Sequence, residues 1–197
     1  MPSTEHALLA EIRRCAICAD VLPFGPRPVV QFSSEARTLI VGQAPGRKVH
    51  ESGVPFDDAS GDRLREWMGI DRDAFYDARR VAILPMGFCY PGTGKSGDLP
   101  PRPECAPAWR HKLLAMADSI ELTLVIGSYA RDWHLRELKG KTLTGAVRTE
   151  ENGTGGTFLL PHPSPRNNIW LSKNPWFEAE ILPRLRRAVA RVVSGEG

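Results

Sequence analysis

Short apolar runs alternate with segments of helical periodicity along this chain. The apolar runs are closed by turn or loop residues, as expected of buried strands, and they cover 37–42, 81–84, 122–127 and 158–160. Helical patterns occupy the segments before, between and after them, at 4–14, 61–68, 105–117, 129–135 and 175–193. Strands that alternate with helices predict an α/β fold whose mostly parallel sheet is covered on both faces.

One long stretch interrupts this alternation. Residues 85–103 are rich in Pro and Gly and lack periodicity, which predicts a long ordered or semi-ordered loop. Long loops in compact domains are usually functional. Cys89 lies near the start of this loop and Cys105 just past its end, so metal ligation would explain how it stays ordered.

Length and charge narrow the class of protein. The chain has 197 residues, of which 42% are hydrophobic, so we expect a single domain over 1–197. A net charge of +3 permits a polyanionic partner without requiring one. No apolar segment approaches the roughly 20 residues of a membrane span, and we expect a soluble, cytoplasmic monomer. A reducing cytosol favours metal-binding thiolates over disulfides.

Four cysteines form the most informative pattern. Cys15 and Cys18 make a C-x2-C pair that can hold one centre from a single turn, while Cys89 and Cys105 must be carried there by the fold. Four thiolates suit either zinc or an iron-sulfur cluster. Compact zinc sites usually take two close pairs, and the single pair here favours iron and sulfur. Four unrelated buried thiols remain the alternative.

Residues 91–96 match the phosphate-binding loop motif only in part. The Gly-Lys-Ser ending fits that motif, but Cys89 stands where the first glycine is required. Three prolines follow within a few residues, and they exclude the helix whose N-terminus would bind phosphate. Nucleotide hydrolysis is therefore not expected.

Two loops at predicted strand ends carry the candidate chemistry, 42–46 and 162–168. The carboxyl ends of parallel strands form the usual binding edge of such a sheet. Glycines let backbone amides approach a ligand, prolines hold the loops rigid, and His162 can donate a hydrogen bond to a developing anion.

These two loops, together with Gly53-Val54-Pro55-Phe56, resemble the motifs of the uracil-DNA glycosylase superfamily in order and spacing. The iron-sulfur branch, family 4 and its relatives, carries cysteines in the arrangement found here. The resemblance implies a three-layer α/β/α sandwich with a central four-stranded parallel sheet. It also implies a 4Fe-4S cluster bound by the four cysteines and excision of uracil from DNA.

The resemblance also implies roles for individual residues. Phe56 matches the aromatic residue that stacks on the flipped base, and His162 matches the residue that contacts uracil O2. Gly42, Gln43 and Ala44 fall in the motif that activates water on the sugar side of the pocket. Arg166 falls near a residue that some relatives insert into the base stack, and Ser164 either caps a turn or binds phosphate. We expect further phosphate contacts from Lys95 and Lys173.

The first motif departs from the family pattern. Family 4 enzymes usually have Glu where this chain has Gln43, and other branches have Asp or Asn where it has Ala44. An amide cannot act as a general base, so a carboxylate elsewhere would have to activate water; the candidates are Asp57 and Asp58, then His50 and Glu51. Pro85 stands where relatives commonly have the Asn that reads the uracil edge, so backbone amides would carry more of the recognition.

The sequence thus predicts a repair enzyme that flips uracil out of DNA and hydrolyses its N-glycosidic bond. Two alternatives remain at this point. One is a non-catalytic or product-holding module for uracil-containing DNA, which the altered first motif would fit. The other is a glycosylase for hypoxanthine, xanthine or mismatched thymine.

Overall fold

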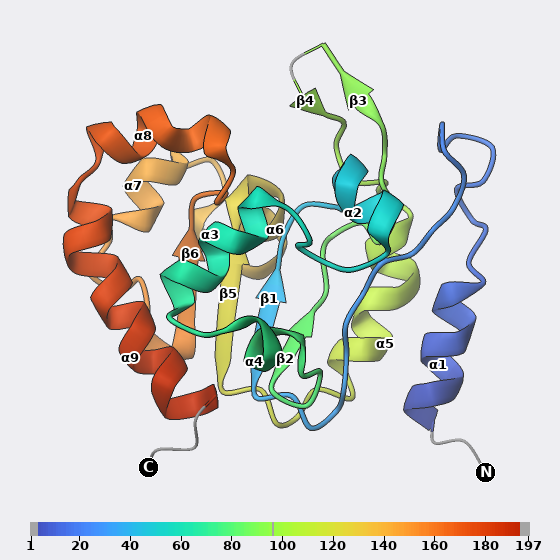
Figure 1. Ribbon diagram of the computed structural model, residues 1–197, viewed down its shortest axis with the longest axis horizontal. Helices are drawn as coiled ribbons and strands as arrows, with labels where there is room; N and C mark the ends of the chain where they lie inside the picture. The colour runs from blue at the N-terminus through green and yellow to red at the C-terminus, as the bar shows by residue number, and fades with distance from the viewer. Residues whose placement is uncertain (1–3, 96, 194–197) are drawn as a thin grey trace.

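A computed structural model describes residues 4–95 and 97–193 and contains the expected parallel sheet (Figure 1). Its four strands lie in the order β2 (Val81–Ile83), β1 (Thr38–Val41), β5 (Leu122–Ile126) and β6 (Thr157–Leu160). All three pairings are parallel, and Thr38 at the start of the central strand pairs with Val81 and Leu122. The strands are buried along nearly their whole length, which accounts for their unbroken apolar sequences.

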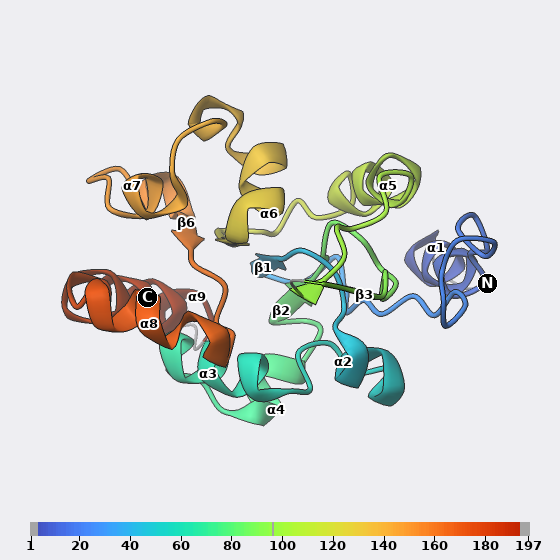
Figure 2. The ribbon, with the colours of Figure 1, turned by 90° about the horizontal axis from the view of Figure 1, so that it is seen from above.

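Helices cover both faces of this sheet (Figure 2). One layer contains α3 (Ala59–Met68), α4 (Arg72–Tyr76) and α9 (Leu182–Val193), and the other contains α5 (His111–Leu114), α6 (Gly127–His134) and α7 (Leu143–Val147). The amphipathic helix α9 turns its apolar stripe, including Leu185 and Val189, into the core. The three-layer α/β/α arrangement is therefore confirmed.

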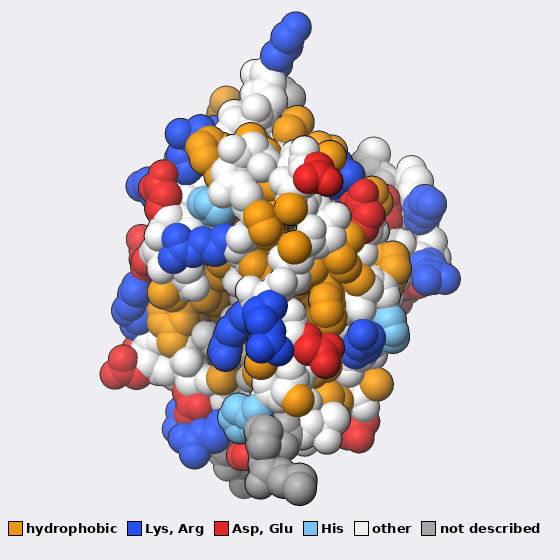
Figure 3. Space-filling view, turned by 90° about the vertical axis from the view of Figure 1, so that its right-hand side faces the viewer, with side chains coloured by type: hydrophobic (Ala, Val, Ile, Leu, Met, Phe, Trp, Pro, Cys, Tyr) orange, Lys and Arg blue, Asp and Glu red, His pale blue; other side chains and the backbone are white. Residues whose placement is uncertain are grey.

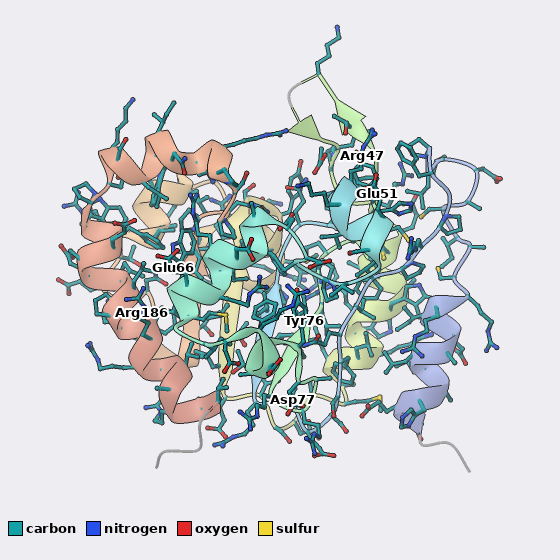
Figure 4. The ribbon with its side chains drawn as sticks, viewed as in Figure 1. Arg47, Glu51, Glu66, Tyr76, Asp77 and Arg186 are labelled. Carbon is teal, nitrogen blue, oxygen red and sulfur yellow. The ribbon has the colours of Figure 1, made fainter. Side chains whose placement is uncertain are left out.

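Polar contacts add to the packing between helices. The Arg186 side chain of α9 donates to the Glu66 carbonyl oxygen of α3 at 3.1 Å, and Figure 4 shows the two residues side by side. Beyond the β2 edge, α1 (Thr4–Arg13) buries Leu8, Leu9 and Ile12. None of the described helices is long and apolar enough to cross a membrane.

Two of the expected helices differ in form. The segment predicted as one helix over 105–117 is a π-helical turn, Ala106–Arg110, followed by the single turn of α5. The C-terminal helix likewise begins as a π-helical turn, Phe177–Ile181, before α9. Helix α3 starts two residues before the predicted start, because Asp58 caps it.

Several short elements were not predicted from the sequence. They are α2 (Arg47–Ser52), α4, α7, α8 (Asn168–Lys173) and the 3₁₀ turns Arg136–Leu138, Thr154–Gly156 and Pro165–Asn167. Each is too short to establish a clear apolar period.

The Pro/Gly-rich stretch 85–103 is not a plain loop, because it contains an antiparallel hairpin of β3 (Thr93–Gly94) and β4 (Gly97–Asp98). The hairpin projects beyond the carboxyl edge of the main sheet (Figure 1). Tyr90, just before it, is fully buried. Ser96, the last residue of the phosphate-loop-like motif, lies outside the described residues, and residues 99–104, which follow β4, form no helix.

Candidate active site

An open cleft of about 610 Å³ lies at the carboxyl edge of the sheet. Its walls come from the loops that follow β1, β2 and β6, from the turn before α3, and from the β3–β4 hairpin. Eight residues expected to act at one site line this cleft: Gly42, Gln43, Ala44, Phe56, Asp58, His162, Ser164 and Arg166. The chain thus brings together motifs that are separated by more than a hundred positions in the sequence.

The loop after β1 is held in place by the chain that follows β2. The Gly42 carbonyl oxygen accepts from the Met86 amide at 2.8 Å, and the Gln43 carbonyl oxygen accepts from the Gly87 amide at 2.9 Å. The Gln43 side chain is also engaged, because its Nε2 donates to the Leu99 carbonyl oxygen at 3.1 Å. This bond links the first motif to the residue directly after the hairpin.

Phe56 adopts a strained backbone conformation beside this loop. Its φ of 54° is the only positive value of a non-glycine residue in the described part of the chain. Gly61 makes this possible, because any side chain there would collide with the Phe56 carbonyl oxygen. The ring lies over Gly42, where an added Cβ would be 3.7 Å from the ring, and its centroid is 6.2 Å from that of Phe75. Phe56 is therefore held as a half-buried aromatic wall of the cleft.

His162 is arranged as a neutral hydrogen-bond donor. Its Nδ1 accepts from the Ser164 amide at 3.2 Å, so the neutral ring carries its proton on Nε2. Burial lowers the pKa of His162, and the negative charges of Asp58 and Asp98 oppose that effect only in part. The imidazole can therefore donate to an anion without itself being charged.

The loop that carries His162 is braced from α3. Arg63 donates to the Ser164 carbonyl oxygen at 3.0 Å and to Asn168 Oδ1 at 2.8 Å. Ser164 uses its hydroxyl to accept from the Arg166 amide at 3.2 Å, so in this structure it caps a turn. The Arg166 guanidinium lies against Gly97, which places this side chain across the mouth of the cleft next to the hairpin.

Of the two aspartates expected from the sequence to activate water, only Asp58 lines the cleft. Asp58 borders the cleft, but its Oδ1 accepts from the Gly61 amide at 2.9 Å as the cap of α3. Asp57 does not border the cleft and pairs with Arg72 at 2.9 Å, which lowers the pKa of its carboxyl. Of the second pair, His50 packs against Phe24 and Tyr90, and the Glu51 carbonyl oxygen accepts from Arg27.

The four cysteines meet around a second, smaller cavity. Two N–H groups point at their sulfurs: the Trp109 indole donates to Cys15 at 3.2 Å, and the Phe88 amide donates to Cys105 at 3.2 Å. Burial raises the pKa of Cys89 to about 11 and that of Cys105 to about 12, and neighbouring thiols add to both shifts. All four cysteines are free, and within the described residues no three Cys, His, Asp or Glu side chains form a group that could hold a single metal ion.

The N-terminal part of the chain, with α1 and the segment between Cys15 and β1, lies on one side of the molecule (Figure 1), and Figure 3 faces this side. Hydrophobic side chains are interspersed with charged side chains of both signs on this side. Within the segment itself, Ile17, Val21 and Phe24 are exposed. The Phe24 ring stacks on Tyr90 at 5.6 Å and also lies under the Arg47 guanidinium at 5.1 Å. These contacts join the cysteine-bearing segment to α2 and the wall of the cleft.

A family model described as the uracil DNA glycosylase superfamily matches residues 29–186. The chain belongs to the uracil DNA glycosylase superfamily. The match includes every loop that lines the cleft, as well as Cys89 and Cys105, whereas Cys15 and Cys18 precede it. Membership of the superfamily indicates a DNA glycosylase that acts in DNA repair.

Some residues of this glycosylase site were missed from the sequence. Asp98 and Thr93 enter the cleft only because the hairpin folds back, and two-residue strands leave no pattern to detect. Arg63 was missed because an arginine on an exposed helix face is usually a solvated charge. Trp109 was also missed. Its position four residues after Cys105 in a predicted helix would have placed it on the same face as that thiol.

Proposed function

We propose that this glycosylase flips uracil out of DNA into the cleft and hydrolyses its N-glycosidic bond. The observation that carries the proposal is the pairing of an aromatic wall, Phe56, with a neutral imidazole donor, His162, in one cleft. A flipped pyrimidine has an apolar face for stacking and a carbonyl edge for hydrogen bonding, and this pairing offers a partner for each.

The chemistry follows from the charges that develop as the bond breaks. The sugar becomes cationic and the departing uracil becomes anionic, so a donor fixed near uracil O2 stabilises the transition state more than the substrate. His162 Nε2–H would supply that donor. Because burial lowers the pKa of His162, the ring is held in its neutral form, which still donates from Nε2.

DNA would reach the cleft past several cations. Arg47, Lys48 and Arg166 line it, and Figure 4 shows Arg47 at the end of α2 beneath the hairpin. Lys95 lies in the hairpin turn and Lys173 ends α8, where both can meet phosphates beyond the flipped base. Binding through such contacts weakens steeply with added salt.

We also propose that Cys15, Cys18, Cys89 and Cys105 bind a 4Fe-4S cluster. The donor set fits, because four thiols surround one cavity and receive N–H donors of the kind that tune cluster sulfurs. The described residues contain no group that could hold a single metal ion. Ligands of a cluster bind separate irons and need not lie as close together as those of a single zinc ion. The cluster would supply a structural link between the N-terminal segment and the long loop.

The alternatives are tested together with the proposal. Stoichiometric protein is incubated with oligonucleotides that contain uracil, hypoxanthine, xanthine or mismatched thymine, and the abasic products are cleaved with alkali. We expect scission at uracil, and a fall of about 10²-fold or more in single-turnover rate for His162→Ala. Scission only at another base would change the substrate, and no scission at any base would favour a non-catalytic binding module.

A further inference from the structure

The cleft contains an acidic side chain that the motifs do not include. Among the described residues, the carboxylates that line the cleft are those of Asp58 and Asp98. At position 43, where the family pattern that this chain resembles has an acid, this chain has Gln. The amide of Gln43 cannot take a proton from water. One of these two carboxylates is therefore the nearest available group for that task.

One carboxylate oxygen of Asp58 is committed to the fold. Its Oδ1 accepts from the Gly61 amide at 2.9 Å and caps α3, and Gly61 is packed against the Phe56 carbonyl. The side chain must keep this orientation for α3 to begin where it does and for Phe56 to keep its strained backbone. An amide at this position would serve the cap as well as a carboxylate does.

Asp98 is an exposed residue of the hairpin that faces the first motif. A Cβ placed on Gly46 would lie 3.5 Å from Asp98 Oδ2, so the carboxylate stands directly against the loop after β1. Its Oδ1 has only a long contact, 3.5 Å, with the Thr93 hydroxyl. The oxygen directed at Gly46 makes no hydrogen bond with the described residues.

Gln43 fixes the position of this carboxylate. Its Nε2 donates to the carbonyl oxygen of Leu99, the residue next to Asp98, at 3.1 Å. A glutamate at position 43 would set a carboxylate against that carbonyl oxygen and lose the bond. The amide in the first motif thus acts as an anchor for the hairpin, and the hairpin brings in the acid.

We propose that Asp98 is the catalytic carboxylate of this site, taking the place of the acid that the first motif lacks. This inference rests on the proposed glycosylase function. Asp98 shares the cleft with His162 and is close enough for its charge to raise the pKa of that imidazole against the larger effect of burial. A ligand in this cleft can therefore meet both groups, and the proposal assigns His162 to the base and Asp98 to the sugar.

The step balances with water as the only co-reactant. The C1′–N1 bond breaks, and its electron pair leaves with uracil as an anion that accepts the His162 hydrogen bond. A water oxygen bonds to C1′ while the Asp98 carboxylate takes one proton of that water. Uracil is then protonated from solvent, Asp98 returns its proton to solvent, and an abasic sugar remains.

Three variants test the assignment in single-turnover cleavage of a uracil-containing oligonucleotide. We expect Asp98→Asn to slow cleavage by about 10²- to 10⁴-fold, the usual contribution of a general base. Asp58→Asn should lose far less, and Asp73→Asn, which removes an exposed charge on α4, controls for net charge. Binding to an oligonucleotide with a non-cleavable 2′-fluoro-deoxyuridine should be retained or tightened in Asp98→Asn, which separates chemistry from folding.

Chemical rescue distinguishes a catalytic role of Asp98 from a structural one, because a small carboxylate in solution can replace a missing base but cannot repair the fold. In Asp98→Ala, added formate should restore part of the lost rate, because a small carboxylate can enter the open cleft. If Asp98→Asn or Asp98→Ala cleaves within about fivefold of wild type, or if formate restores nothing to a slow Asp98→Ala protein that still binds DNA, the assignment is overturned. If wild-type protein cleaves nothing, the proposed function fails and this inference fails with it.

Discussion

The side-chain amide of Gln43 donates a hydrogen bond to the carbonyl oxygen of Leu99 at 3.1 Å. This single bond connects the loop after β1 to the residue that follows the β3–β4 hairpin, 56 positions along the chain. The bond explains why position 43 has an amide and not a carboxylate, because only a donor can form a hydrogen bond with the Leu99 carbonyl oxygen. The departure of this chain from the pattern it resembles is thereby linked to the placement of Asp98.

Gln43→Glu should lower both the stability of the protein and its cleavage rate. The new carboxylate would face the Leu99 carbonyl oxygen, so we expect a loss of about 1 kcal/mol in the free energy of unfolding. Single-turnover cleavage should fall by about tenfold or more as the hairpin shifts. Urea denaturation and cleavage assays measure the two effects, with Gln43→Leu as the uncharged comparison. A faster Gln43→Glu enzyme would mean that position 43 itself is the place for the acid.

Gly61→Ala should disturb Phe56 through the backbone. The added methyl group would collide with the Phe56 carbonyl oxygen, and we expect a loss of about 1–3 kcal/mol in the free energy of unfolding, with weaker cleavage. Gly145→Ala is the matched control, because its added Cβ meets only the Thr142 hydroxyl, at 3.0 Å. Equal stability of the two variants would show that the positive φ of Phe56 does not depend on Gly61.

The sheet could be predicted because each strand is a run of residues buried on both faces. Leu39, Ile40 and Val41 leave almost no surface exposed, and such runs need no alternation to be recognised. Helix α2 could not be predicted, because Val49 is its one buried residue and six positions are too few to show a period. The π-helical turn after Cys105 depends on packing that the sequence pattern does not carry.

The site could be predicted as far as its motifs extend. Phe56 and His162 stand in loops with recognisable spacing, and both lie in the cleft. Asp98 carries no such signal, because it lies among Gly and Pro residues in a hairpin with two-residue strands. Its position depends on the Gln43 bond, a contact between side chain and backbone that only the folded chain reveals.

Stability should fall as the solution becomes acidic through the titration of His134. Burial and the nearby Arg110 charge lower its pKa to about 4, and its Nε2 accepts from Arg110 at 2.6 Å. The unfolded chain takes up a proton near pH 6.5 while the folded chain does not, so stability is lost as pH falls from about 6.5 to 4. The loss is at most about 1.4 kcal/mol per pH unit for this group.

The measurement is urea denaturation at several pH values between 7 and 4. His134→Gln should flatten the dependence, and His111→Gln, at an exposed position, should not. Part of the slope should remain in His134→Gln, because burial also lowers the pKa of His162. An unchanged slope in His134→Gln would contradict the assignment.

The cysteine site should contain iron and sulfide in roughly equal amounts, about four of each per chain. Anaerobically purified protein should be brown, with the broad visible absorbance of thiolate-bound clusters. Cys105→Ser should lose colour and iron, whereas Ser33→Ala, at a residue that does not line the cavity, should keep both. If wild-type protein is colourless and contains stoichiometric zinc, the cluster proposal is wrong and the cysteines bind a single ion.

Release of the free base tests the central claim most directly. Stoichiometric protein is mixed with a uracil-containing oligonucleotide, and the low-molecular-mass fraction is analysed by mass spectrometry after denaturation. We predict free uracil in an amount close to that of the oligonucleotide, at a rate that falls by about 10²-fold or more in His162→Ala. Intact uracil-containing DNA, bound but with no free base formed, would contradict the account.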